Sequence, residues 1–276
     1  MNRRRTSTRR RGPLAAVNLC ALLLGTNLNA QERVIRVAAA ADLQFAMPDL
    51  VRQFEKQAGT MVDVTYGSSG NFFSQLQNGA PFDLFFSADI AYPQKLATAG
   101  IAQPGTLYEY AVGRIAIWMS ADTKIDLAHE GWAALLDSRV QKIAVANPDH
   151  APYGRAAVAA LEKAGLYERV KAKLVYGENI SQAAQFVQSG NAQAGIVALS
   201  LAVSPGMKQG KRWEIPADLH PPIEQAAILM KGSKNQREAR AFMQFVTSKA
   251  GRETLALYGF ISPAASAAAP GGLQKE

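Results

Sequence analysis

"YGSSGNFFSQLQNG", residues 66–79, is the stretch of sequence that decides the fold class. It lies between two apolar runs, MVDVTY at 61–66 and FDLFFSAD at 82–89. An apolar run, a loop of small residues and a short helical segment predict a strand, a turn and a helix, followed by the next strand. The Gly-Ser-Ser-Gly loop at 67–70 could then serve as a nucleophile turn, a phosphate-binding loop or an anion site without chemistry.

The same alternation of strands and helices continues along the chain. Strands are expected at 33–41, 62–66, 83–87, 113–120, 142–147, 172–177, 194–199 and 223–230. Strands that alternate with helices of this length indicate an α/β protein with mostly parallel, buried sheets.

The length of the chain allows two lobes of ordinary domain size. We expect lobe 1 to comprise residues 31–112 and 222–260, and lobe 2 to comprise residues 113–221. No long linker is visible, so the chain should pass between the lobes through two short crossover segments, near 110–114 and 216–224.

Residues 1–30 are predicted to be a secretory signal peptide, because six arginines precede a short apolar run and small residues at a cleavage site. The chain has 30 basic and 22 acidic residues, a net charge of +8. Without the six arginines the balance is 24 against 22, or +2, so the charge does not indicate nucleic-acid binding. We expect a periplasmic protein with no membrane insertion after processing.

The only cysteine, Cys20, lies within the predicted signal peptide. The processed chain therefore offers neither disulfides nor thiol chemistry. At the other end, residues 261–276 are rich in Ala, Pro and Gly and are predicted to be a disordered tail.

Four turns place a helix start just after a strand. The Gly-Ser-Ser-Gly loop is one, and the others are Pro152-Tyr153-Gly154, the Asn179-Ile180 step and the 38–44 segment, where Asp42 is expected to cap the first helix. Free backbone N–H groups and the positive end of the helix dipole favour an anion at such turns. Ser69 and Tyr153 add hydroxyl donors, and neutral donors suffice for a small, fully ionised oxyanion.

Motifs for covalent chemistry are incomplete. A nucleophile elbow requires G-x-S-x-G, but Asn71 stands where the last glycine should be. No lysine follows the loop as a phosphate-binding P-loop requires. His129, His150 and His220 are scattered, so no zinc pattern is present. We expect binding without catalysis and without a cofactor.

The ordered set of turns resembles the periplasmic molybdate-binding proteins of ABC transporters, a class II solute-binding family. The matching segments are VAAAADLQFAM (37–47), GSSGNFFSQLQNGAPFDLFFSAD (67–89), GWAALL (131–136), IAVANPDHAPYGRAA (143–157), GENISQAAQFVQSGNAQAGIVAL (177–199) and LYGF (257–260). The resemblance implies a two-lobe periplasmic-binding-protein-like fold joined by two crossover segments. It also implies a monomer that holds molybdate or tungstate in the cleft and delivers it to an inner-membrane ABC permease.

Matching the family position by position implies five ligand-binding residues: Ala41, Asp42, Ser69, Tyr153 and Ile180. Ser69 and Tyr153 would donate hydroxyl protons, Ile180 would donate its backbone amide, and no residue would coordinate the metal directly. The first turn departs from the family, because Ala41 stands where a serine is frequent. A carboxylate would repel the anion, so we expect the side chain of Asp42 to point away and only its backbone to contribute.

Two alternatives remain open at the level of sequence. The first is a binder of another oxyanion, namely sulfate, phosphate or phosphonate, for which an inward-facing acid would accept the hydrogen of a protonated ligand. The second is a secreted serine hydrolase that uses Ser69, for which the sequence shows no paired base.

Overall fold

The computed structural model describes residues 34–263, so the predicted signal peptide and residues 264–276 of the predicted tail lie outside the described residues. Ile261 exchanges two backbone hydrogen bonds with Val112, at 2.8 and 3.0 Å, so the start of the predicted tail is part of the fold. No helix within residues 34–263 is long and apolar enough to cross a membrane.

The first sheet has five strands in the order β2-β1-β3-β10-β4. The strands are β1 (Val34–Ala40), β2 (Met61–Gly67), β3 (Leu84–Ser87), β4 (Tyr108–Gly113) and β10 (Ile223–Leu229). β1 runs parallel to β2 and β3, whereas β10 runs antiparallel to β3 and β4.

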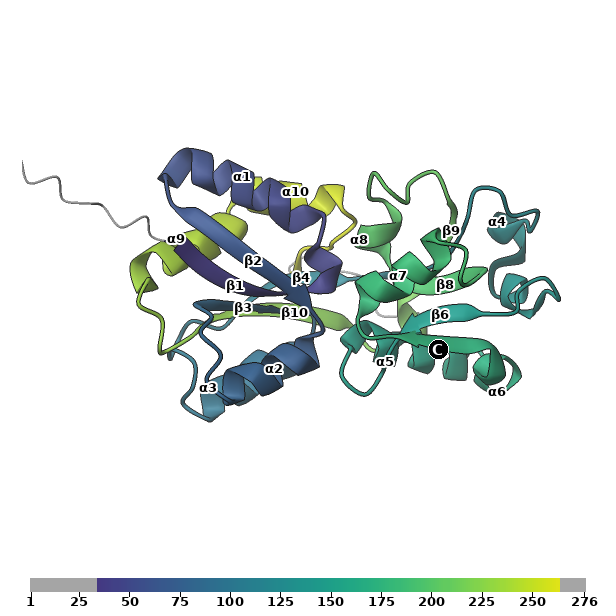
Figure 1. The fold of residues 1–276 in the computed structure, drawn as a ribbon, viewed down its shortest axis with the longest axis horizontal. Coiled ribbons are helices and arrows are strands. Elements are labelled where there is room, and N and C mark those ends of the chain that lie inside the picture. Colours follow the sequence, from purple (N-terminus) through teal and green to yellow (C-terminus); the bar gives the residue numbers. More distant parts are fainter. Residues whose placement is uncertain (1–33, 264–276) are drawn as a thin grey trace, which may run out of the picture. The chain divides into compact units, whose positions relative to one another are not determined.

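Helices cover both faces of this sheet, with α1, α9 and α10 on one side and α2 and α3 on the other (Figure 1). Their bounds are α1 (Ala46–Ala58), α2 (Ser69–Gln77), α3 (Ala91–Thr98), α9 (Gln236–Val246) and α10 (Lys249–Leu257). Successive side chains of a strand point to opposite faces, so Val37 packs in the cluster of the first group and Ala38 in that of the second. We call this sheet and its helices lobe 1.

The second sheet also has five strands, in the order β7-β6-β8-β5-β9. They are β5 (Ile115–Met119), β6 (Ile143–Ala146), β7 (Leu174–Gly177), β8 (Ala194–Ala198) and β9 (Lys211–Glu214). The flanking helices are α4 (Leu127–Glu130), α5 (Pro152–Lys163), α6 (Tyr167–Val170), α7 (Ile180–Gln188) and α8 (Leu199–Ala202). Short 3-10 helices are η1 (Ala41–Leu43) in lobe 1 and η2 (Gly131–Leu136), η3 (Lys171–Lys173) and η4 (Ala217–Leu219) elsewhere. We call the second sheet and α4–α8 lobe 2.

The expected α/β architecture is present, with two differences from the sequence prediction: β4 and β9 were not expected as strands, and both sheets are mixed. In the second sheet β6 is parallel to β7 and β8, but β5 is antiparallel to β8 and β9. The antiparallel strands adjoin the places where the chain changes sheet. It passes from β4 to β5 at Arg114 and returns through residues 215–222 to β10. A strand that arrives from the other lobe enters its sheet from the opposite end and therefore runs against its neighbours.

Candidate functional site

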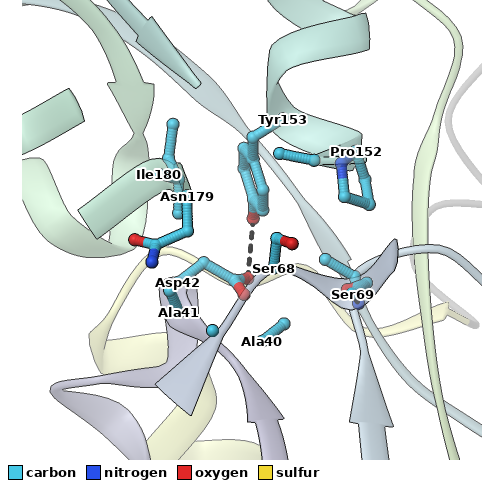
Figure 2. A pocket seen from close by; sticks show the side chains of 12 residues that line it. Ala40, Ala41, Asp42, Ser68, Ser69, Pro152, Tyr153, Asn179 and Ile180 are labelled. Atoms are coloured by element: carbon cyan, nitrogen blue, oxygen red, sulfur yellow. Dashed lines mark hydrogen bonds between the residues drawn. The ribbon is translucent and has the colours of Figure 1, made fainter. Parts of the chain in front are cut away.

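One cavity lies where the two lobes face each other, at the carboxyl ends of parallel strands of both sheets. All five residues predicted to bind the ligand line it: Ala41, Asp42, Ser69, Tyr153 and Ile180 (Figure 2). The first three come from lobe 1 and the last two from lobe 2. The cavity is small, with a volume of about 10 Å³ for the centres of water-sized molecules. Pockets for drug-sized ligands have about 300–1,000 Å³, so a drug-sized ligand is excluded from this one.

The turn between β2 and α2 prepares Ser69 as a donor. The preceding residue, Ser68, is the N-cap of α2, and its hydroxyl accepts a hydrogen bond from the Asn71 amide at 3.3 Å. Ser69 does not cap the helix; its Oγ accepts from the backbone amide of Ala88 at 2.9 Å. A hydroxyl has one proton and two acceptor sites, so Ser69 still has its proton for a ligand.

The start of α7 follows the prediction from the sequence. Asn179 is the N-cap, and its side chain accepts from the Gln182 amide at 3.0 Å. Ile180 is the first residue of the helix, where backbone N–H groups lack intrahelical partners. Its side chain is buried in the core of lobe 2, so only its amide is available to the cavity.

The prediction that Asp42 caps a helix and turns its side chain away is wrong. Asp42 is the middle residue of η1, and neither η1 nor α1 has a side-chain cap. Its side chain is fully buried and faces Tyr153 across the cavity (Figure 2). The Tyr153 hydroxyl donates to Asp42 Oδ2 at 2.9 Å, so in this structure its single proton goes to Asp42 and not to the cavity, unlike the predicted donation to the ligand. The local sequence could not indicate this contact because the two residues belong to different lobes.

Gln225 is the functional residue that the sequence prediction missed. It lies in β10 and is completely buried. Its Nε2 donates to Asp42 Oδ2 at 2.7 Å and to the Tyr153 hydroxyl oxygen at 2.9 Å, while its Oε1 accepts from the Tyr110 hydroxyl at 2.7 Å. The available signal was a glutamine directly before the apolar residues 226–230 of the strand predicted at 223–230, because a buried amide requires partners.

Burial changes the acidity of the Asp42 carboxyl. Desolvation raises the pKa of Asp42 to about 6, and the hydrogen bonds from Gln225 and Tyr153 offset part of the increase. Its second oxygen, Oδ1, is buried and has no hydrogen-bond partner within the described residues. The Oγ of Ser200 donates to the backbone oxygen of Asp42 at 2.7 Å and fixes the position of η1 against α8.

The lobes contact each other around the cavity. The Gly70 amide at the start of α2 donates to the His150 carbonyl at 2.9 Å, and His150 Nδ1 lies 3.1 Å from Ser68 Oγ. On another side, Arg155 of α5 forms an ion pair with Asp89 of lobe 1, with the two charged groups 2.5 Å apart. These contacts surround the cavity and describe a closed arrangement.

Within residues 34–263 Ser69 has no hydrogen bond to a histidine; the hydroxyl that His150 contacts is that of Ser68. The second ring nitrogen of His150 lies 3.7 Å from Glu178 Oε2. Within residues 34–263 no group of three or more His, Cys, Asp or Glu side chains is arranged to hold a metal ion.

A cavity between two α/β lobes, lined by helix starts and neutral donors, is typical of solute-binding proteins. Residues 35–261 match the family model described as bacterial extracellular solute-binding protein. The chain therefore belongs to this family.

Individual relatives agree with this assignment. The chain is 39% identical over 232 residues to the molybdate-binding protein ModA of Azotobacter vinelandii, covering 84% of this chain and 91% of the relative. The solved periplasmic molybdate-binding protein of the same organism superimposes with a TM-score of 0.78 and 32% identity, covering 83% of this chain and 99% of that one. A structure described as the substrate-binding domain of a putative molybdenum ABC transporter from Clostridium difficile has a TM-score of 0.64 and 28% identity, covering 83% of this chain and 98% of that one.

Proposed function

We propose that this protein is the molybdate-binding component of an ABC importer, with tungstate as a second ligand. The observation that carries the proposal is the gathering of the five predicted residues around one small cavity between the lobes. The similarity over most of the chain to proteins named for molybdate binding supports the same ligand.

The proposed site holds the anion through neutral donors. Ser69 contributes its hydroxyl, and the first residues of η1, α2 and α7 contribute backbone amides, among them those of Ala41 and Ile180. Hydrogen bonds to an ionised group are roughly twice as strong as bonds between neutral groups, and exclusion of water strengthens them further. A dianion is thereby stabilised without a lysine or arginine in the cavity.

Capture and release would follow from movement of the lobes about the two crossings at Arg114 and residues 215–222. Opening would separate donors on η1 and α2 from donors on α5 and α7, and closure would bring them back around the anion. We further propose that the protein acts as a periplasmic monomer, presents both lobes to an inner-membrane permease, and carries out no turnover.

A panel of anions tests the ligand. Thermal unfolding of the processed protein is measured with molybdate, tungstate, sulfate, phosphate and methylphosphonate. A ligand that binds only the folded state at a thousandfold excess over its Kd stabilises it by about 4 kcal/mol. We expect large shifts with molybdate and tungstate and a small one with sulfate, whose tetrahedron is smaller. Absence of a shift with both metal oxyanions would refute the proposal, and a larger shift with phosphate would favour the alternative ligand.

The hydrolase alternative is tested with generic ester substrates, comparing the wild-type protein with Ser69→Ala and Ser68→Ala. Ser68 is included because its hydroxyl is the one next to His150. We expect negligible hydrolysis in all three proteins and weaker anion binding in Ser69→Ala. A hydrolysis rate that either substitution abolishes would show that the site is catalytic.

A further inference from the structure

A buried carboxylate, that of Asp42, lines the cavity proposed to bind a dianion, although two negative charges at this distance would repel each other. Its side chain is fully buried and lines the cavity, together with the donors proposed for the ligand. Oδ2 accepts two side-chain hydrogen bonds, whereas buried Oδ1 has no partner of good hydrogen-bond geometry in the described part of the chain. The backbone amides of Asp42 and Leu43 lie close enough to lower the pKa of the carboxyl, but less than Gln225 and Tyr153 do. Figure 2 shows the carboxyl group in the space between Tyr153 and the η1 backbone. An ionised carboxylate at this position would repel an anion.

We propose that the oxyanion is captured together with one proton, which Asp42 holds on its buried carboxyl while the anion is bound. This inference rests on the proposed function and names how the same site is regulated. The proton comes from solvent and attaches to a carboxylate oxygen, so the charge of Asp42 is cancelled and no covalent bond breaks. A protonated carboxyl becomes a hydrogen-bond donor, like every other group proposed to hold the anion.

The surroundings of Asp42 provide no other way to cancel its charge. Its donors are the Tyr153 hydroxyl, the Gln225 side-chain amide and the backbone amides of Asp42 and Leu43, and all of them are neutral. The largest influences on the pKa of this carboxyl within residues 34–263 are burial and neutral hydrogen-bond donors, and no cation is among them. A buried charge without a counter-ion is costly, so burial shifts the carboxyl toward its protonated form, although the ionised form still predominates near pH 7.5 until an anion arrives.

The other ionisable side chains that face the surroundings of Asp42 stay neutral near physiological pH. Among the described residues, Tyr110 on β4 and Tyr153 on α5 interact with the charge of Asp42, and Tyr66 lies on β2, the strand that packs against η1. Burial raises the pKa of Tyr66 to about 12 and holds the pKa values of Tyr110 and Tyr153 well above their usual value. α7 and α8 carry no ionisable side chain, and Arg155 of α5 is paired at the rim. Asp42 is therefore the group that takes up the proton.

The acidity of Asp42 sets the pH range. Because burial raises its pKa to about 6, the empty site is mostly ionised at pH 7.5 and binding must draw a proton from solvent. A nearby anion favours the protonated form further. Apparent affinity should then fall as pH rises, approaching tenfold per pH unit, and between pH 6.5 and 8.5 the loss should be roughly 75-fold.

The experiment combines two titrations with molybdate on the processed wild-type protein. Calorimetry at pH 7.5 in two buffers of different ionisation enthalpy gives the number of protons taken up, and we expect about one per anion. Affinity is then measured from pH 6.5 to 8.5. Asp42→Asn keeps the shape of the side chain and always presents a donor. We expect no proton uptake, a change of less than about twofold over this range, and tighter binding than wild type at pH 8.5.

His150→Gln is the matched control, because it removes the ionisable side chain at the rim that contacts Ser68. It should keep the proton uptake and the pH slope of the wild-type protein. Binding of molybdate by the wild-type protein without proton uptake and without pH dependence would overturn the inference while leaving the proposed function intact. A wild-type protein that binds no molybdate at any pH would instead refute the proposed function. If proton uptake disappeared in His150→Gln but persisted in Asp42→Asn, His150 rather than Asp42 would be the residue that takes up the proton. That result would also overturn the inference.

Discussion

Gly70→Ala should prevent full closure of the lobes while leaving each lobe folded. Gly70 is the second residue of α2, and its amide donates to the His150 carbonyl of lobe 2. A Cβ atom at Gly70 would lie 2.6 Å from the His150 carbonyl oxygen and 2.9 Å from the His150 Cβ. The contacts are between lobes, so the clash exists only when the lobes are closed.

The geometry gives the size of the effect. Ordinary contacts of a Cβ begin near 3.4 Å, so the loop that carries His150 must retreat by roughly 0.8 Å. That displacement breaks the Gly70–His150 bond of 2.9 Å and the Ser68–His150 contact of 3.1 Å. Each neutral hydrogen bond contributes about 1 kcal/mol net, so the closed state loses about 2 kcal/mol. This loss corresponds to roughly 30-fold weaker binding.

Calorimetric titration with molybdate measures the affinity, and thermal unfolding without ligand reports the fold. The ligand-free midpoint should be unchanged or slightly higher, because alanine is the better helix former. Gly232→Ala is the matched control, since a Cβ there meets nothing within 4 Å. Gly154→Ala is the contrasting case, because its Cβ would lie 2.2 Å from the Ala146 oxygen of the same lobe and should lower the midpoint without ligand. Gly70→Ala with near wild-type affinity, or with a midpoint as low as that of Gly154→Ala, would refute the reasoning.

Three further predictions concern individual side chains. Ser69→Ala removes a donor to a charged ligand, worth about 1.5–3 kcal/mol, so calorimetry should show roughly 10- to 150-fold weaker molybdate binding, and an unchanged Kd would exclude Ser69 as a ligand. Arg155→Ala breaks a half-exposed ion pair with Asp89, which should contribute at most about 1 kcal/mol, so an affinity loss much above fivefold would contradict this estimate. Asp42→Asn should stabilise the ligand-free protein near neutral pH. In the wild-type protein the folded-state pKa of Asp42, about 6, exceeds the unfolded value, so the folded state binds more protons than the unfolded state. The wild-type protein therefore loses stability as pH rises from about 4 to 7. The difference in unfolding free energy between the Asp42→Asn variant and wild type, from urea titrations, should grow from near zero at pH 4 to about 3 kcal/mol at pH 7, and a difference that does not change with pH would disprove the linkage.

The prediction of the fold from the sequence succeeded where the signal is local. The alternation of apolar runs and turns identified eight of the ten strands in the described residues, since the two periodicities and the turn residues are properties of neighbouring positions. The sequence prediction missed β4 and β9; β9, KRWE, has no apolar run to mark it. The same applies to Asn179 as the cap of α7 and to the small-residue turn before α2. The mixed direction of the sheets was missed, because pairing direction depends on where the chain crosses between lobes.

The sequence alone also determined which turns supply the site, because free amides at a helix start follow from the chain's own order of strand, small residues and helix. Only the tertiary structure decided what the side chains do there. Asp42, Tyr153 and Gln225 are far apart along the chain, yet they share one hydrogen-bonded cluster between the lobes. A buried carboxyl takes its orientation and its pKa from the groups that desolvate and contact it. Those groups come from β10 and α5, so no pattern around residue 42 could have revealed them.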